Sequence, residues 1–180
     1  MSIVTATIDI PAAPAEVWKV IMDPARLGDW VTIHRGLRHA DSGLPRVGFE
    51  MDQRLHLRGV SLDVHWRLIE CEPNRHAVWE GRGPARSRAR TEYTLSPATL
   101  GPSTPNPSAT SGKDSARESR EGTGTRFDYS NEFRPPLGPI GALASRALVG
   151  GMPEREARHT LERLRTLLSG GCAKGDTPAP

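Results

Sequence analysis

The sequence of 180 residues has little that would indicate a disulfide-stabilised, exported or membrane-spanning protein. Its two cysteines, Cys71 and Cys172, lie far apart and form no CxxC pair, so neither a disulfide framework nor a cysteine metal site is expected. The first residues show no basic segment followed by an apolar run, which argues against a secretory signal peptide. No stretch is apolar over the thickness of a bilayer. These absences predict a cytoplasmic protein without a membrane span.

Familiar catalytic patterns are missing too. The sequence has no HExxH motif, no Gly-rich phosphate loop and no Ser-His-Asp order, and no carboxylate pair falls on a predicted apolar strand face. His34 could act as a general base at a cavity mouth, but no Ser or Cys nucleophile accompanies it. His56, Asp63 and His65 fall on a predicted wet face, which favours a surface cluster over a metal site. No metal or dedicated cofactor is expected, and whether the protein is an enzyme stays open.

Residues 96–125 lack aromatic side chains and contain a single leucine. Ser, Thr, Pro and Gly dominate this segment, so it cannot bury enough apolar surface to offset the entropy of ordering. Strand-like runs flank it on both sides. We therefore predict a disordered hairpin insertion within one domain, which covers residues 1–169. The tail, residues 170–180, is also predicted to be disordered.

Apolar and polar residues alternate with period two over much of the remaining chain. This pattern covers residues 49–57, 62–68, 85–95 and 127–133. Clean alternation over consecutive runs predicts antiparallel strands with one dry face and one wet face. The first two runs are predicted to meet at a two-residue turn, Gly59-Val60, which would place His56 opposite Asp63.

Three arginines, Arg86, Arg88 and Arg90, alternate along the wet face of residues 85–95. Such a ribbon could contact RNA or an acidic partner. The acidic residues expected beside it on neighbouring strands are Glu80, Asp128 and Glu132. They favour a charge-balanced, solvated surface, and the exposed aromatics of a nucleic-acid reader are not evident. Nucleic-acid binding is therefore not expected, whereas a protein partner remains possible.

Both ends of the sequence carry helical patterns. Residues 11–30, "PAAPAEVWKVIMDPARLGDW", read as two short helices, the second capped by Asp23, started by Pro24 and ended by Gly28. Residues 137–168 have apolar positions at helical spacing and predict a long amphipathic helix. The stretch "GGMP" at 150–153 should kink or break that helix, either as a static feature or as a hinge.

A strand, two short helices, six antiparallel strands and a long helix form the order of the helix-grip fold. The 11–30 stretch is similar to the helix pair of the START/polyketide cyclase (SRPBCC) superfamily, which includes the birch-pollen allergen and lipid-transfer START domains. The resemblance implies an α+β fold, in which a curved seven-stranded antiparallel sheet wraps around the C-terminal helix. It also implies an internal cavity that binds a hydrophobic small molecule, such as a lipid or a polyketide-like compound.

Two alternatives to simple binding follow from the same resemblance. One is polyketide cyclase or dehydratase activity, in which the protein would hold a reactive chain in a productive shape. The other is a toxin of a toxin–antitoxin pair acting on translation, because "DWVTIHRGLRH" and "LGPIGALASRAL" resemble a mycobacterial branch so described.

Candidate ligand contacts lie on the predicted apolar faces. The amides of Gln53 and Asn131 need partners there, which a ligand, water or nearby backbone could supply. Small residues such as Ala89 leave either close packing or space. The full candidate set is Trp30, Gln53, Trp66, Trp79, Ala89, Thr91, Tyr93, Phe127, Tyr129, Asn131 and Phe133.

Overall fold

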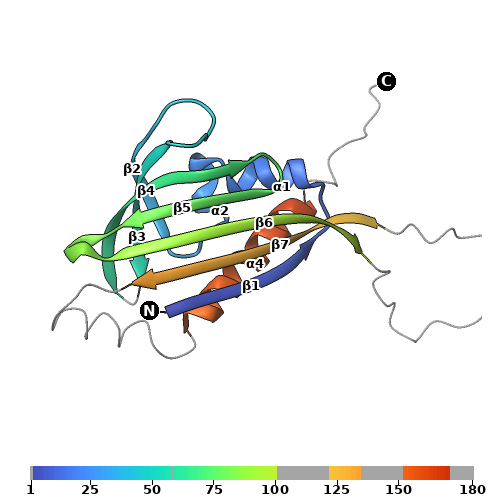
Figure 1. Cartoon of the computed structure of the whole chain (residues 1–180). Helices are drawn as coiled ribbons and strands as arrows, with labels where there is room; N and C mark the ends of the chain where they lie inside the picture. The colour runs from blue at the N-terminus through green and yellow to red at the C-terminus, as the bar shows by residue number, and fades with distance from the viewer. Residues whose placement is uncertain (1, 58, 101–121, 135–151, 171–180) are drawn as a thin grey trace, which may run out of the picture.

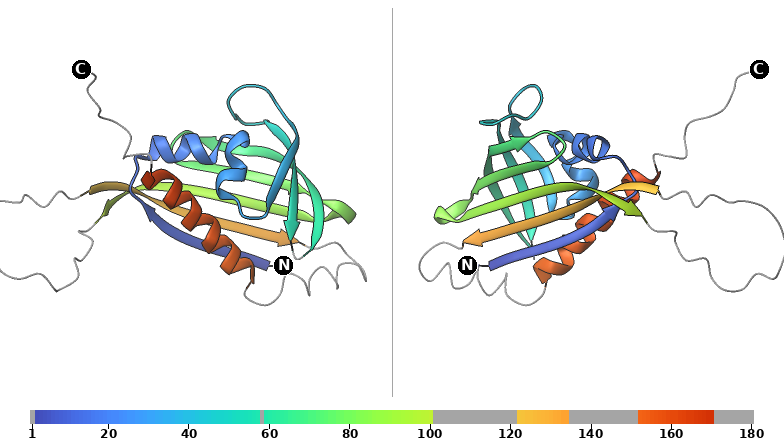
Figure 2. Two further views of the ribbon diagram at one scale, coloured as in Figure 1. Left: turned by 180° about the vertical axis from the view of Figure 1, so that it is seen from behind. Right: turned by 45° about the vertical axis from the view of Figure 1, so that its right-hand side comes forward.

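A seven-stranded antiparallel sheet dominates the computed structural model, which describes residues 2–57, 59–100, 122–134 and 152–170 (Figure 1). The strands are β1 (Ser2–Ile10), β2 (His34–Ala40), β3 (Glu50–Leu57), β4 (Val60–Glu72), β5 (His76–Arg82), β6 (Arg88–Leu100) and β7 (Gly122–Arg134). Their spatial order is β1-β7-β6-β5-β4-β3-β2. Figure 2 shows all the helices on one side of this curved sheet. The predicted α+β helix-grip class is confirmed.

The helices after β1 are α1 (Pro14–Ile21), a 3₁₀ turn η1 (Pro24–Arg26) and α2 (Leu27–Trp30). The predicted cap is present, because the Asp23 Oδ1 atom accepts a hydrogen bond of 2.9 Å from the Ala25 N–H. The prediction that Gly28 ends the second helix is wrong. The helix runs on to Trp30, whose indole is fully buried, so tertiary packing outweighs the low helix propensity of glycine.

The C-terminal helix α4 (Met152–Ser169) packs on β1 and on α2. Its buried apolar positions, Ala157, Leu161 and Leu164, follow one another at helical spacing and face the sheet. Pro153 lies in the first turn, where its missing N–H has no helical partner to lose. The rest of the predicted helix and of the predicted break lies outside the described residues.

The boundaries predicted for the insertion at 96–125 are wrong at both ends. Strand β6 continues to Leu100 and β7 begins at Gly122, and the two remain paired as far as Leu100 opposite Gly122. Backbone hydrogen bonds form this ladder, and they need no apolar side chains, so composition did not reveal it. Residues 101–121 and 171–180 lie outside the described residues.

The predicted register of the β3–β4 hairpin is wrong by two residues. Leu57 pairs with Val60, and Arg54, not His56, lies opposite Asp63. Gly59 has φ +81°, and the second position of a two-residue hairpin turn favours glycine for that reason. A shift of two leaves every side chain on its predicted face.

Strand β6 begins later in the sequence than predicted, because the β5–β6 connection is longer. Pro84–Arg86 form a 3₁₀ turn, η2, and β6 starts at Arg88, so Ala85 and Arg86 are not strand residues. Pro84 has no N–H to give to a ladder, and the chain needs these residues to reverse direction.

Replacing Thr125 by valine should lower the free energy of unfolding by about 1–3 kcal/mol. The Thr125 side chain is fully buried, and its hydroxyl donates a 2.7 Å hydrogen bond to the Ala12 carbonyl beyond the end of β1. Valine would leave that carbonyl without its partner. Urea denaturation measures the change. Thr7→Val is the matched control, because the Thr7 hydroxyl bonds Asp128 at an exposed position, and equal losses in the two variants would contradict the prediction.

Candidate functional site

The helix side of the sheet, α2 and the first half of α4 enclose a cavity of about 160 Å³. Aromatic side chains from α2 and from four central strands form much of its wall. They are Trp30, Trp66, Trp79, Tyr93 and Tyr129. Trp30 packs edge-on against Tyr93 at a ring-centroid distance of 6.2 Å, and Tyr93 stacks with Tyr129 at 6.0 Å. Trp30, Tyr93 and Tyr129 therefore form one aromatic cluster within the wall.

Most of the predicted site residues line this one cavity. They are Trp30, Gln53, Trp66, Trp79, Thr91, Tyr93, Tyr129 and Asn131. The structure does not place Ala89, Phe127 or Phe133 in the lining. Phe127 is fully buried in the core against Tyr93, and Ala89 lies between Gly81 and Phe133 in a neighbouring cross-strand row. Alternation along a strand identifies a face, but the position along that face decides between core and cavity.

Glycine 81 positions one of the aromatic walls. Gly81 lies directly opposite Trp66 across the β4–β5 pair. A Cβ atom at Gly81 would lie 2.8 Å from the Trp66 ring, so only glycine lets the indole lie this close to the strand. Gly81 thus makes room for Trp66 in the cavity wall.

A single cross-strand row contributes four residues to the lining. Val4 pairs with Asn131, Asn131 with Thr91, and Thr91 with Trp79, across β1, β7, β6 and β5. Burial raises the pKa of the Tyr129 hydroxyl, while the nearby Asn131 and Thr91 side chains partly oppose that rise. Tyr129 therefore stays protonated at neutral pH, and this part of the cavity carries no charge.

Three buried polar atoms in the cavity wall have no hydrogen-bond partner among the described residues. They are Trp30 Nε1, Trp66 Nε1 and Asn131 Oδ1. An unpaired buried polar group costs about 1–3 kcal/mol, so such atoms are rare in stable folds. Two donors and one acceptor, all in residues that line the cavity, thus lack partners among the described residues.

Gln53 has a different environment. Its side chain is 5% exposed, and its amide lies 2.9 Å from His34 Nδ1. Burial lowers the pKa of His34, so the imidazole is neutral near pH 7 and can share a hydrogen bond with the amide. Of the two predicted amides, Gln53 therefore has a local partner, whereas the Asn131 Oδ1 atom has none among the described residues. Within the described part of the chain, no group of His, Cys, Asp or Glu could hold a metal ion.

A polar cluster at the cavity rim was not predicted from the sequence. The Thr32 hydroxyl donates to Glu156 Oε2 at 2.8 Å and lies 3.0 Å from the Thr160 hydroxyl, which joins the α2–β2 connection to α4. These contacts join residues more than a hundred positions apart, so no local sequence pattern predicts them. The spacing of Glu156 and Thr160 by four residues places them on one face of α4, which is the one available signal. Other lining residues not predicted are Val4, Leu27, Val31, Ile33, Met51, Leu55 and Ala157.

Solved structures with the same fold include several bacterial proteins. The protein TTHA0849 from Thermus thermophilus has a TM-score of 0.65 at 15% identity, covering 96% of this chain and 100% of that one. DR_A0006 from Deinococcus radiodurans has a TM-score of 0.60 at 16% identity, covering 95% and 99%. At these identities the likeness shows the fold. No helix in the described segments has the length and apolar character to span a membrane.

Curated relatives come from Mycobacterium tuberculosis. A protein named toxin Rv0910 is 22% identical over 173 residues, covering 94% of this chain and all of the relative. An uncharacterized protein, Rv1546, is 23% identical over 150 residues, covering 83% and 90%. The family described as polyketide cyclase/dehydrase and lipid transport matches residues 1–169. Because this match covers nearly the whole chain, the protein with this aromatic cavity is a member of the polyketide cyclase/dehydrase and lipid transport family.

Proposed function

We propose that the protein binds a compact, mainly apolar small molecule in the cavity between the sheet, α2 and α4. The observation that carries the proposal is the set of three unpaired polar atoms in residues of a mainly apolar wall. Ligand sites combine apolar walls with a few polar groups that set orientation. A ligand that pairs with these atoms would remove their desolvation cost, so binding energy and ligand orientation would come from the same contacts.

The cavity size favours a ligand of about one ring. A volume of about 160 Å³ is close to that of an engineered cavity of about 150 Å³ that holds benzene. Pockets for larger organic ligands measure about 300–1,000 Å³. The described walls therefore suit a monocyclic or short-chain compound better than a diacyl lipid. The indole N–H groups call for an acceptor on the ligand, and the Asn131 carbonyl calls for a donor.

Calorimetric titration with p-cresol and toluene tests this proposal. The two molecules have nearly the same size, but only p-cresol has a hydroxyl that can donate to Asn131 Oδ1. We expect both to bind and p-cresol to bind more tightly. Native mass spectrometry of the freshly purified protein should also show a co-purifying small molecule. Failure of both compounds to bind, together with a clean unliganded mass, would contradict the proposal.

Replacing Asn131 by leucine should remove the preference for p-cresol. The hydrogen bond to the ligand hydroxyl is lost, which corresponds to about a tenfold weaker affinity, whereas toluene binding should change little. The ligand-free variant should be more stable than the wild type, because the unpaired carbonyl is gone. Calorimetry and thermal unfolding measure the two effects. Thr94→Val, on the same sheet but outside the lining, serves as the control, and an equal loss of p-cresol affinity there would count against the assignment.

A second candidate function is growth inhibition, which the relative named toxin Rv0910 favours. Induced expression in a mycobacterial host tests it directly, with growth as the readout. Arrest by the wild-type protein would support this function. Normal growth at a verified expression level would exclude it, and ligand binding would stand unaffected.

A further inference from the structure

Charged residues on the outer face of the sheet follow the cross-strand register. One row crosses strands β3 to β7 through residues of strictly alternating charge. In order these are Glu50, Arg67, Glu80, Arg90 and Glu132. Opposite charges on directly opposed residues stabilise a sheet, so the stability of the fold is enough to explain this row.

The neighbouring row breaks that rule. Two residues farther along each strand, Arg82, Arg88 and Arg134 lie directly opposite one another on β5, β6 and β7. Like charges in directly opposed positions destabilise a sheet. Arg134 contacts Glu132 at 2.7 Å, but in the described part of the chain no carboxylate lies within 4.0 Å of the Arg82 or Arg88 guanidinium. On β4, His65 extends the row and is held by Asp52 at 2.7 Å.

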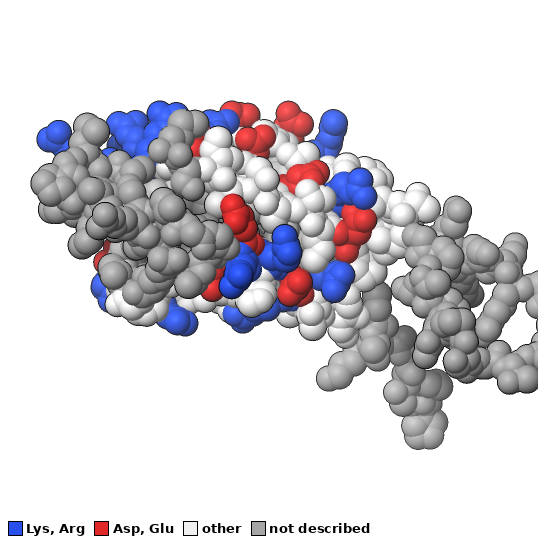
Figure 3. Space-filling view, turned by 90° about the horizontal axis from the view of Figure 1, so that it is seen from below, with Lys and Arg blue, Asp and Glu red and all other residues white. Residues whose placement is uncertain are grey.

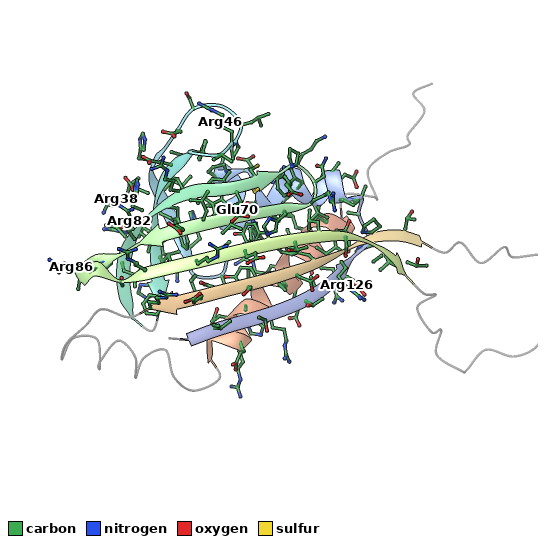
Figure 4. All side chains as sticks on the ribbon, viewed as in Figure 1. Arg38, Arg46, Glu70, Arg82, Arg86 and Arg126 are labelled. Carbon is green, nitrogen blue, oxygen red and sulfur yellow. The ribbon has the colours of Figure 1, made fainter. Side chains whose placement is uncertain are left out.

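The β5–β6 turn brings a further arginine to the same end of the sheet. Figure 4 shows Arg82 and Arg86 at this end of the sheet, and Figure 3 shows basic side chains gathered at that end of the molecule. Ala85 and Arg86 have φ values of +53° and +64°, a left-handed conformation that residues with side chains rarely adopt. The turn is held by hydrogen bonds from the Gly83 N–H and the Ser87 hydroxyl. Such strain persists where the surrounding structure imposes it, often at functional sites.

A hollow of about 190 Å³ lies between the two rows. Its rim carries four arginines and two carboxylates, and the backbone of Gly81 and Ala89 forms part of its surface. The charged residues are Glu80, Arg82, Arg88, Arg90, Glu132 and Arg134. None of the lining residues is aromatic, so the hollow offers no surface on which a nucleic-acid base could stack.

We propose that this hollow binds the phosphate group of a small molecule, with Arg82 and Arg88 as its principal ligands. Guanidinium groups donate paired hydrogen bonds to phosphate oxygens, and a dianion would relieve the repulsion between the opposed arginines. Glu80 and Glu132 limit the positive field to the arginine row, which favours a compact anion over a long polyanion. The site lies on the outer face of the sheet and does not depend on the internal cavity.

Thermal unfolding in inorganic phosphate and in adenosine monophosphate tests the site, with sodium chloride at matched ionic strength as reference. We expect both compounds to raise Tm beyond the salt reference. Stronger binding of the nucleotide would identify a phosphate ester as the ligand, and equal binding would identify free phosphate. Arg88→Gln should weaken binding about tenfold or more, because a charge-assisted hydrogen bond is lost. Without phosphate, the same variant should be more stable than the wild type, since the opposed charges are relieved.

Arg126→Gln is the matched control, because Arg126 lies at the far end of the same face and is paired with Asp9 at 2.9 Å (Figure 4). Phosphate affinity in this variant should equal that of the wild type. The proposal is overturned if phosphate gives no stabilisation, or if Arg88→Gln and Arg126→Gln respond alike. Tight binding of a short single-stranded RNA that the mononucleotide does not displace would also overturn it.

Discussion

Replacing Ala157 by phenylalanine should strongly weaken binding of p-cresol and toluene and leave the fold intact. Ala157 is 8% exposed and faces the cavity from α4. A phenyl ring placed there occupies the space that a single-ring ligand needs. Burial of such a ring is worth about 1.5–3 kcal/mol, so affinity should fall about ten- to hundredfold. Calorimetric titration measures the loss, and Tm should stay equal or rise because the cavity is filled.

Two further variants make this result interpretable. Glu162→Phe places the same ring on the exposed face of α4 and should bind both compounds like the wild type. Val4→Phe fills the cavity from the β1 side and should reproduce the loss of binding if the ring on α4 proves too large to fold. Normal binding in a folded Ala157→Phe protein would rule out the cavity as the site.

Replacing Gly81 by alanine should destabilise the protein by about 1–3 kcal/mol, the usual cost of overpacking a core. The added methyl group would lie 2.8 Å from the Trp66 ring and 3.0 Å from Val64. The ring is only 7% exposed and has core residues around it, so it cannot move aside without disturbing the cavity wall. Urea denaturation followed by tryptophan fluorescence gives the free energy of unfolding.

A double-mutant cycle separates this clash from a general glycine effect. Trp66→Leu is destabilising by itself, but Gly81→Ala should cost little when added to it, because the methyl group then has room. Gly28→Ala is the control, since the nearest atom to its Cβ is His34 Cδ2 at 3.5 Å, and helical alanine should be neutral or stabilising. Equal losses from Gly81→Ala with and without Trp66 would refute the packing explanation.

The residues of the cavity wall show which features of the site can be predicted from the sequence. The alternation of Met51, Gln53 and Trp66 assigns each to the dry face, and all three line the cavity. The same reasoning placed Phe127 there, although it lies in the solid core. Periodicity reports which face a side chain takes, but the distance along the strand from the cavity depends on where the helices pack.

The site components contributed by the helices were harder to predict. Glu156 lies on a helix that the sequence predicts to pack on the sheet, but its hydrogen bond with Thr32 depends on the position of α4 relative to the α2–β2 connection. Likewise, the pairing of Arg82 with Arg88 depends on the β5–β6 turn, whose C-cap is Ser87.

The sequence by itself determined the order of elements, the two faces of the sheet and the Asp23 cap, because each depends on interactions between residues close together in the chain. Tertiary structure alone decided the strand register, the unpaired polar atoms around the cavity and the opposed arginines. The physical reason is that a register shift of two residues keeps every side chain on its face yet changes all its cross-strand neighbours. The contacts that make both proposed sites are of that kind.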